Sequence, residues 1–445
     1  MIDHWRLAIE QFSLCPLCLC GENRRFVFYR PDGKRMKVTA KPPQARVEDE
    51  LILCCSRTQG DEKTSDRIRA LLKNEIDWSY LKKRGRWHGI MPLLYVNINQ
   101  ACNGEVPEDL RRKLKEHYMA SSRQNLVLAG ELIRLLRLFE SNGIPIVPYK
   151  GPALAVMAYR DLTLRSFDDL DILVHKADVM KAKEVLISQG YEPAFPLKGA
   201  QENAYLESPF EYSHHFGRGD GLGFVDLHWT IEPEYLTFAP STEQLWKRLQ
   251  LVDLEGFPIE TLSAKDTLLF LCIHGTKHRW ERLIWLCDLA AFVETCGAIN
   301  WKEIMDQVET LGIKRMVSLS LLLARNLLGV NLPQEVRNRI TEDAGIRSLM
   351  GQVYQNLFRE TQAQSWPFES GLFYLRAMDR LKDKSLYCFN AFVKPSRLEL
   401  RDLPLPAFFF PLYYVIRPIR LAAKYGLKLT DQALNSVKEK SSRQS

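Results

Sequence analysis

Residues 165–174 read RSFDDLDILV and residues 224–229 read FVDLHW, and these two stretches decide the fold. Each has the length and apolar content of a buried strand. Side chains alternate along a strand, so Asp169 and Asp171 share one face while the apolar residues around them take the other. Asp226 lies in the second strand and supplies a third carboxylate. Carboxylates held side by side repel each other unless a cation lies between them, so the pattern indicates a divalent-metal site.

Carboxylate oxygens are hard ligands that suit Mg²⁺ or Mn²⁺. Attack on a nucleotide α-phosphate needs one ion to activate the acceptor hydroxyl and a second to stabilise the departing pyrophosphate. Such ions lie about 3.5–4 Å apart, so a third aspartate more than about 8 Å from the other two would exclude this chemistry. A lone D-x-D is otherwise typical of solvated acids at the end of a strand.

The surrounding sequence predicts a small sheet between helices. Strands are predicted at 144–149, 170–174, 213–216 and 223–229, and helices at 128–141, 152–159 and 177–189. From Ser263 onward the pattern is helical almost to the end of the chain. Strands confined to the middle of the sequence, with helices on both sides, predict an α+β core with a small mixed sheet inside a mainly helical protein.

The 445 residues, of which 46% are hydrophobic, fit a globular protein of two or three domains. We predict five regions: 1–45, an extension typical of partly disordered segments; 46–125, an N-terminal helical region; 126–260, the α+β core; 261–345, a helical domain flanking the cleft; and 346–445, a C-terminal helical region with a basic, aromatic tail. The net charge of +7 suits a phosphate-bearing ligand but indicates no specific nucleic acid.

The chain contains ten cysteines, no secretory leader precedes them, and no apolar run reaches the ~18 residues that span a bilayer. A cytoplasmic protein with reduced thiols is therefore expected. Cys15, Cys18 and Cys20 could form half of a zinc site, although free thiols are the simpler interpretation.

Residues 403–416 (LPLPAFFFPLYYVI) precede basic residues and could make peripheral membrane contact. The three prolines favour a segment packed on the body of the protein instead.

Further motifs follow in a fixed order. They are Lys150-Gly151, Arg165, the 169–174 stretch DLDILV, the 226–229 stretch DLHW and the 271–280 stretch LCIHGTKHRW. A strand, a glycine turn, a helix, D-x-D on the next strand and then a third aspartate resemble the DNA polymerase β-type nucleotidyltransferase superfamily. The set resembles more closely a bacterial family of uncharacterised nucleotidyltransferases, over about residues 47–425.

This resemblance implies a metal-dependent transfer of NMP from an NTP such as ATP to an unknown acceptor, which could be a small molecule, a sugar or a protein. The three aspartates would be the catalytic residues and the metal ligands. Lys150 and Arg165 would contact the triphosphate, and Gly151 would let the backbone approach the phosphates. Lys277 and His278 would lie near the phosphates or the base.

Several features leave alternatives open. Pro152 stands where the superfamily has a phosphate-binding serine, so a nucleotide-binding or partner-binding module with little or no turnover is the alternative function. His228 shares a strand face with Asp226 and could support the metal ligands or act as a base. His274 and His278 could instead form a polar seam between domains. The large aromatic residues Trp229 and Trp280 are expected in the core.

Overall fold

The computed structural model describes residues 26–29, 35–38 and 46–423, apart from gaps at 59, 103–105, 107, 198, 209–210, 220–222, 234–235, 237–240, 298, 360–366 and several positions between 396 and 411. Within the predicted extension, β1 (Phe26–Tyr29) and β2 (Arg35–Val38) form an antiparallel pair. The cysteine cluster at 15–20 lies outside the described residues.

A five-stranded mixed sheet forms the centre of the fold, in the order β3-β4-β7-β6-β5. Its strands are β3 (Ile146–Pro148), β4 (Asp169–Val174), β5 (Tyr191–Pro193), β6 (Ser213–Arg218) and β7 (Phe224–His228). The β4 and β7 strands run parallel, and the other neighbouring pairs are antiparallel. This confirms the predicted α+β class. The short edge strand β5 and the separate hairpin of β8 (Gln250–Leu254) and β9 (Phe257–Thr261) were not predicted.

Helices occupy most of the remaining described chain. Those before the sheet are α2 (Val47–Cys54), α3 (Glu62–Leu72), α4 (Trp78–His88), α5 (Met91–Cys102) and α6 (Glu108–Ser141). Those between strands are α7 (Gly151–Leu154), the π-helix η1 (Ala155–Tyr159), the 3₁₀-helix η2 (Lys176–Asp178), α8 (Val179–Ser188), α9 (Ala200–Glu207) and α10 (Thr242–Trp246). Those after β9 are α11 (Ala264–Lys277), α12 (Leu283–Thr295), α13 (Trp301–Leu311), α14 (Lys314–Leu323), the π-helix η3 (Ala324–Leu328), α15 (Gln334–Arg339), α16 (Ala344–Leu357), α17 (Pro367–Ala377) and α18 (Leu381–Val393).

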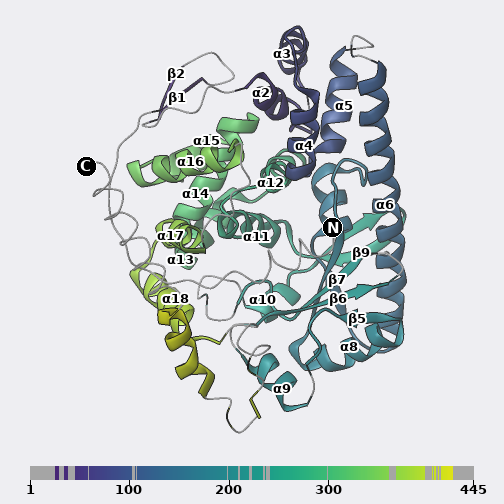
Figure 1. Cartoon of the computed structure of the whole chain (residues 1–445), viewed down its shortest axis with the longest axis vertical. Helices are drawn as coiled ribbons and strands as arrows, with labels where there is room; N and C mark the ends of the chain where they lie inside the picture. Colours follow the sequence, from purple (N-terminus) through teal and green to yellow (C-terminus); the bar gives the residue numbers. More distant parts are fainter. Residues whose placement is uncertain are drawn as a thin grey trace, which may run out of the picture.

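The sheet separates two hydrophobic cores. On one face, Ile172 and Leu227 pack with the apolar stripe of α6 that includes Leu132 and Phe139. On the other face, Leu173 belongs to a larger core shared with α11, α12 and α14. Because Asp171 alternates with Ile172 along β4, its carboxylate points towards the helical side of the sheet. Figure 1 shows the sheet beside the long α6, with α11 and its neighbours on the opposite side.

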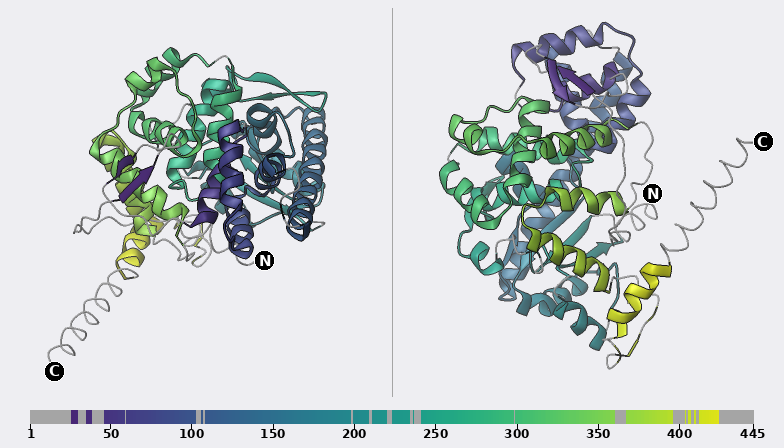
Figure 2. Two further views of the ribbon diagram at one scale, coloured as in Figure 1. Left: turned by 90° about the horizontal axis from the view of Figure 1, so that it is seen from above. Right: turned by 90° about the vertical axis from the view of Figure 1, so that its left-hand side faces the viewer.

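Two boundaries follow local sequence signals. Ser263 caps α11 by accepting a hydrogen bond from the Asp266 amide. The α6 helix ends at Ser141, where the predicted helix ends, and Gly143 follows in the left-handed conformation. The α6 helix is continuous across residues 125 and 126, between which a domain boundary was predicted. The limits of the domains stay predictions. The views in Figure 2 show α17 and α18 lying along the outside of the helical region.

The segment after α18 packs partly on the sheet domain. Tyr413 is buried in the core that includes α6 and β7, and its hydroxyl accepts a hydrogen bond from the Leu405 amide at 2.8 Å. Phe409, Val415 and Ile419 expose about half or more of their surface. None of the helices described here is long and apolar enough to cross a membrane. Peripheral membrane contact through this segment stays a prediction.

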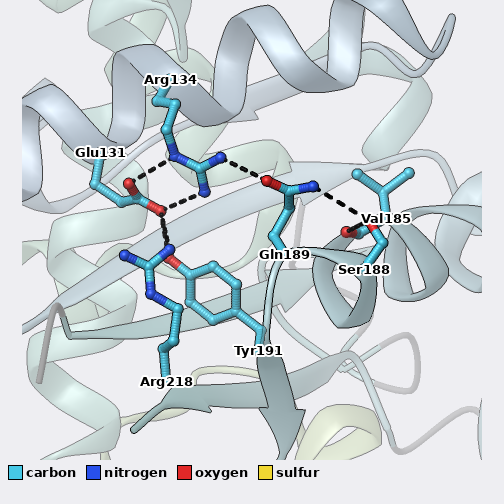
Figure 3. A network of polar contacts seen from close by, with 7 residues as sticks. All are labelled: Glu131, Arg134, Val185, Ser188, Gln189, Tyr191 and Arg218. Atoms are coloured by element: carbon cyan, nitrogen blue, oxygen red, sulfur yellow. Dashed lines mark hydrogen bonds and ion pairs between the residues drawn. The ribbon is translucent and has the colours of Figure 1, made fainter. Parts of the chain in front are cut away.

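A buried carboxylate fastens α6 to the edge of the sheet (Figure 3). Glu131 on α6 accepts hydrogen bonds from Arg134 Nε and Nη2, both at 2.8 Å. The Tyr191 hydroxyl of β5 donates to Glu131 at 2.7 Å, and Arg218 of β6 donates at 3.2 Å. Arg134 also donates to Gln189, just after α8, at 2.8 Å. One carboxylate therefore positions two strands and a helix against α6.

We expect Glu131→Ala to lower the stability of the sheet domain by roughly 3 kcal/mol, because it leaves the buried Tyr191 hydroxyl without its acceptor and removes one acceptor of the Arg218 guanidinium. Chemical denaturation followed by near-ultraviolet circular dichroism measures this loss. Glu140→Ala, at an exposed position of the same helix, is the matched control and should change stability by less than about 0.5 kcal/mol. Equal effects of the two substitutions would show that the Glu131 contacts do not stabilise the fold.

Candidate active site

The parallel pairing of β4 with β7 brings two of the predicted metal ligands together. Asp171 lies directly opposite Asp226, and Leu173 lies opposite His228. One ligand atom from each of Asp171, Asp226 and His228 lies within 4.8 Å of the other two. The separation of Asp171 from Asp226 therefore falls inside the limit of about 8 Å that two-metal chemistry requires.

Asp171 is the most enclosed of the three aspartates, with 3% of its surface exposed. Its Oδ1 accepts a hydrogen bond from Lys150 Nζ at 2.9 Å and lies 3.1 Å from His228 Nε2. Its Oδ2 is buried and has no partner among the described residues. Although burial opposes ionisation, the Lys150 charge and the His228 hydrogen bond hold the pKa of Asp171 below its usual range. The result is a buried carboxylate with one oxygen still to be satisfied.

Asp169 begins β4 on the same face as Asp171 and is half-buried. Burial and the neighbouring charges of Asp171 and Asp226 raise the pKa of Asp169. Three carboxylates on this face therefore repel one another, and the ammonium of Lys150 offsets only part of that charge. A divalent cation placed among them would remove the repulsion.

Sequence reasoning missed a histidine beside Asp226. His215 of β6 lies opposite Asp226 in the antiparallel register, and its Nδ1 is 2.7 Å from Asp226 Oδ1. The neighbouring His214 points to the other face, where its ring stacks on Tyr205 at 4.8 Å. The sequence predicted a strand at 213–216, so alternation could have separated these histidines, but its pairing with β7 was not readable.

The glycine turn has a steric cause. Gly151 adopts a φ of +52°, and a Cβ built on it would lie 3.0 Å from the Asp169 carbonyl oxygen. The turn thus brings α7 against the start of β4 at a distance that only glycine allows. Pro152 occupies the first turn of α7, and all four residues of that helix are buried. Lys150, just before the turn, is placed to reach Asp171.

Arg165 lies in a buried ion pair beside the aspartate cluster. Its Nε and Nη2 donate to Asp288 of α12 at 2.8 and 3.0 Å, and the Tyr159 hydroxyl donates to the same carboxylate at 2.8 Å. Although burial opposes the charge, Asp288 raises the pKa of Arg165. Arg165 therefore ties the loop before β4 to the helical region. Its predicted contact with a triphosphate is untested.

One face of α11 supplies a wall of partly exposed basic and aromatic side chains opposite the sheet. Lys277 Nζ donates to Glu232 at 2.8 Å and to the Tyr212 hydroxyl at 3.2 Å. The rings of His274 and His278 lie 4.6 Å apart, and Trp285 of α12 lies 5.0 Å from His278. Burial, with the nearby charges of Lys277 and Lys150, lowers the pKa of His278 to about 3.

Burial likewise lowers the pKa of His274, helped by the nearby charge of Lys150. Both histidines of α11 are therefore neutral at physiological pH. Their rings lie against each other, and the His274 ring also lies against Trp285. These contacts are consistent with both predictions for the histidines: a polar seam between domains and a surface that contacts the nucleotide.

The remaining part of the HGTKHRW stretch is structural. A Cβ on Gly275 would lie 2.3–2.5 Å from three ring atoms of Trp280, so the glycine makes room for the indole. Trp280 is fully buried, and Trp229 is 1% exposed, which confirms the predicted core positions. The Trp280 amide also donates to the Gly275 carbonyl at 2.8 Å, closing the turn after α11.

Comparison with known proteins assigns the chain to a family. Residues 74–329 match a family described as uncharacterised nucleotidyltransferases, and because the match spans more than half of the chain, the protein belongs to that family. The crystal structure of an antigenic nucleotidyltransferase-like protein from Paracoccidioides brasiliensis is similar at 14% identity and a TM-score of 0.29, covering 47% of this chain and 95% of that one. No curated protein matches the sequence significantly. The predicted family is thus confirmed, while its bacterial origin and the polymerase β-type superfamily stay predictions.

We expect Gly151→Ala to weaken divalent-metal binding, because the added methyl group would push on the start of β4 and displace Asp169. It should also cost about 1–2 kcal/mol of stability for the left-handed backbone. Gly143→Ala is the control, since Gly143 has a φ of +66° and open space around its Cβ position. Isothermal calorimetry with Mn²⁺ separates the two effects. Metal affinity that falls equally in both variants would contradict the role assigned to the Gly151 contact.

Proposed function

We propose that this protein is a metal-dependent nucleotidyltransferase that moves NMP from an NTP to an acceptor. The observation that carries the proposal is the buried Asp171 opposite Asp226, with one carboxylate oxygen that has no partner among the described residues. Burial of an unsatisfied carboxylate oxygen is costly, and a cation is the partner that the neighbouring acids favour. Membership in the nucleotidyltransferase family supports the same chemistry.

Asp169, Asp171 and Asp226 would hold Mg²⁺ or Mn²⁺, and their oxygen donors fit either ion. When bound, two such ions would activate an acceptor hydroxyl and stabilise the negative charge on the departing pyrophosphate. In the transfer, the acceptor oxygen forms a bond to the α-phosphorus, and the bond from that phosphorus to the bridging oxygen breaks. Pyrophosphate leaves with the bonding electron pair, and the hydroxyl proton passes to solvent.

The side chains on the helical side of the site would orient the nucleotide. Lys277 and His278 face the sheet from α11, and Arg282 lies near enough to Asp168 and Asp169 for their charges to act on its pKa. Trp285 offers a ring on which a base could stack. The acceptor would approach from the open side of the aspartate cluster. Its identity is not encoded in any motif of the chain.

Pro152 favours the second candidate, a module that binds nucleotide without turnover. At the first turn of α7 it offers neither a hydroxyl nor an N–H to a phosphate. The second candidate would be supported if the protein bound NTP and metal but released no pyrophosphate with any acceptor fraction tested.

The direct test is transfer of label. Full-length protein is incubated with α-³²P-labelled NTPs, Mn²⁺ or Mg²⁺ and fractionated cell extract, and labelled acceptor and released pyrophosphate are measured. We expect Asp171→Asn and Asp226→Asn to reduce transfer at least about 100-fold, because each loses a metal ligand. Asp168→Asn, at the exposed aspartate before the cluster, should retain transfer. Wild-type transfer by the Asp171 variant would overturn the proposal.

Lys150 gives a second test, because its ammonium donates to Oδ1 of the same Asp171 carboxylate that a cation would bind. We expect Lys150→Met to raise Mn²⁺ affinity roughly tenfold, about 1.4 kcal/mol, and to weaken NTP binding. Lys277→Met is the matched control, since Lys277 pairs with Glu232 and should affect NTP binding alone. Calorimetric titrations of both variants with Mn²⁺ and with NTP distinguish these outcomes. Unchanged Mn²⁺ affinity in the Lys150 variant would show that the ammonium does not compete with the metal.

A further inference from the structure

We propose that His228 is itself a metal ligand through Nε2, so that the site takes a first-row transition cation such as Mn²⁺ in preference to Mg²⁺. The inference rests on the proposed function, since it concerns the same metal. It goes further by replacing an all-carboxylate ligand set with one that includes an imidazole nitrogen. That change alters which divalent ion the protein selects.

The distance between the donor atoms is the first argument. His228 Nε2 lies 3.1 Å from Asp171 Oδ1. Two ligands that each lie about 2.1 Å from one ion, at right angles, are about 3 Å apart. The nitrogen and the oxygen therefore already have the separation of adjacent ligands. One ligand atom from each of Asp171, Asp226 and His228 also lies within 4.8 Å of the other two, which allows one ion to contact all three residues.

The surroundings of the imidazole are the second argument. His228 ends β7 opposite Leu173 of β4 and is 5% exposed. The ring of Tyr149 meets it edge-on at 5.5 Å, and Tyr212 lies 5.7 Å away. These aromatic neighbours hold the ring where Nε2 faces Asp171. A histidine held in this way loses little side-chain entropy when it binds an ion.

The protonation of the ring is consistent with this role. In the hydrogen bond to Asp171, the proton lies on Nε2, and it must leave that atom before Nε2 can bind a cation. His228 Nδ1 is buried and has no partner among the described residues, so it can carry the proton in the other neutral tautomer. In the exchange, Nε2 gives its proton to the Asp171 carboxylate or to water and Nδ1 takes one from water, so the ring stays neutral overall.

The chemistry of the donor set gives the selectivity. Mg²⁺ prefers oxygen ligands and binds imidazole poorly, whereas transition ions accept imidazole readily. His215 provides the internal comparison, because its Nδ1 touches Asp226 Oδ1 at 2.7 Å. Its side chain is 25% exposed and it lies outside the group of residues that could share one ion. His215 is thus a hydrogen-bond partner of a ligand, and His228 is a ligand.

Pulsed electron paramagnetic resonance of the full-length protein loaded with Mn²⁺ tests the inference without a substitution. We expect electron spin echo modulation from a directly bound imidazole ¹⁴N, replaced by the ¹⁵N pattern when the histidines are labelled with ¹⁵N. Mn²⁺ that binds with no nitrogen coupling would overturn the inference and leave the proposed function intact. Failure to bind Mn²⁺ stoichiometrically would overturn both.

Two matched variants then assign the nitrogen. His228→Asn should abolish the modulation and lower Mn²⁺ affinity about 10- to 100-fold, with a smaller loss for Mg²⁺. His215→Asn should keep the modulation, because that imidazole contacts only the carboxylate. Modulation that persists in the His228 variant and disappears in the His215 variant would overturn the assignment. Circular dichroism spectra of both variants establish that they are folded before metal is added.

Discussion

The repulsion between carboxylates on one face of the sheet is the constraint on which the site depends. Parallel pairing of β4 with β7 places Asp171 opposite Asp226, where the helical region covers both strands. Water can screen little of that charge, so the protein must supply compensation. Lys150 provides a fixed positive charge, and the glycine turn that follows it sets how far its side chain must reach. The order of motifs along the chain reflects this single electrostatic requirement.

The parts of this arrangement that depend on local periodicity were predictable from the sequence. Alternation in 165–174 and 224–229 located both central strands and put the aspartates on one face, and the structure agrees. The β8–β9 hairpin was also readable in principle. Glu255-Gly256 stands between two short stretches that contain apolar residues, which is a tight-turn signal in the sequence, and both residues have positive φ values in the structure.

The parts that depend on distant partners were not predictable. Nothing near Arg165 in the sequence indicates that Asp288, more than a hundred residues away, accepts hydrogen bonds from its Nε and Nη2. A single sequence likewise gives no reason to pair His215 with Asp226, because the order of strands in a sheet is not a local property. These contacts change the role that can be assigned to each basic residue. Arg165 and Lys277 are both paired with a buried carboxylate, but the Lys277 side chain is 26% exposed and the Arg165 side chain is 10% exposed, so Lys277 is the more accessible to a ligand.

Under the proposed function, phosphate binding must therefore differ from the helix-terminus mode. The free N–H groups at the start of a helix attract phosphate only if the phosphate can reach them. Here all residues of α7 are buried, and Pro152 removes one N–H from its first turn. Under the proposed function, the positive charge that meets a triphosphate comes from side chains instead, and Lys277, His278 and Arg282 are partly exposed. His278 is neutral at physiological pH, so it can offer a hydrogen bond but no charge. Under the proposed function, Lys150, Lys277, Arg282 and the metal would neutralise the nucleotide, so nucleotide affinity would depend on metal more strongly than in a site with an open helix terminus.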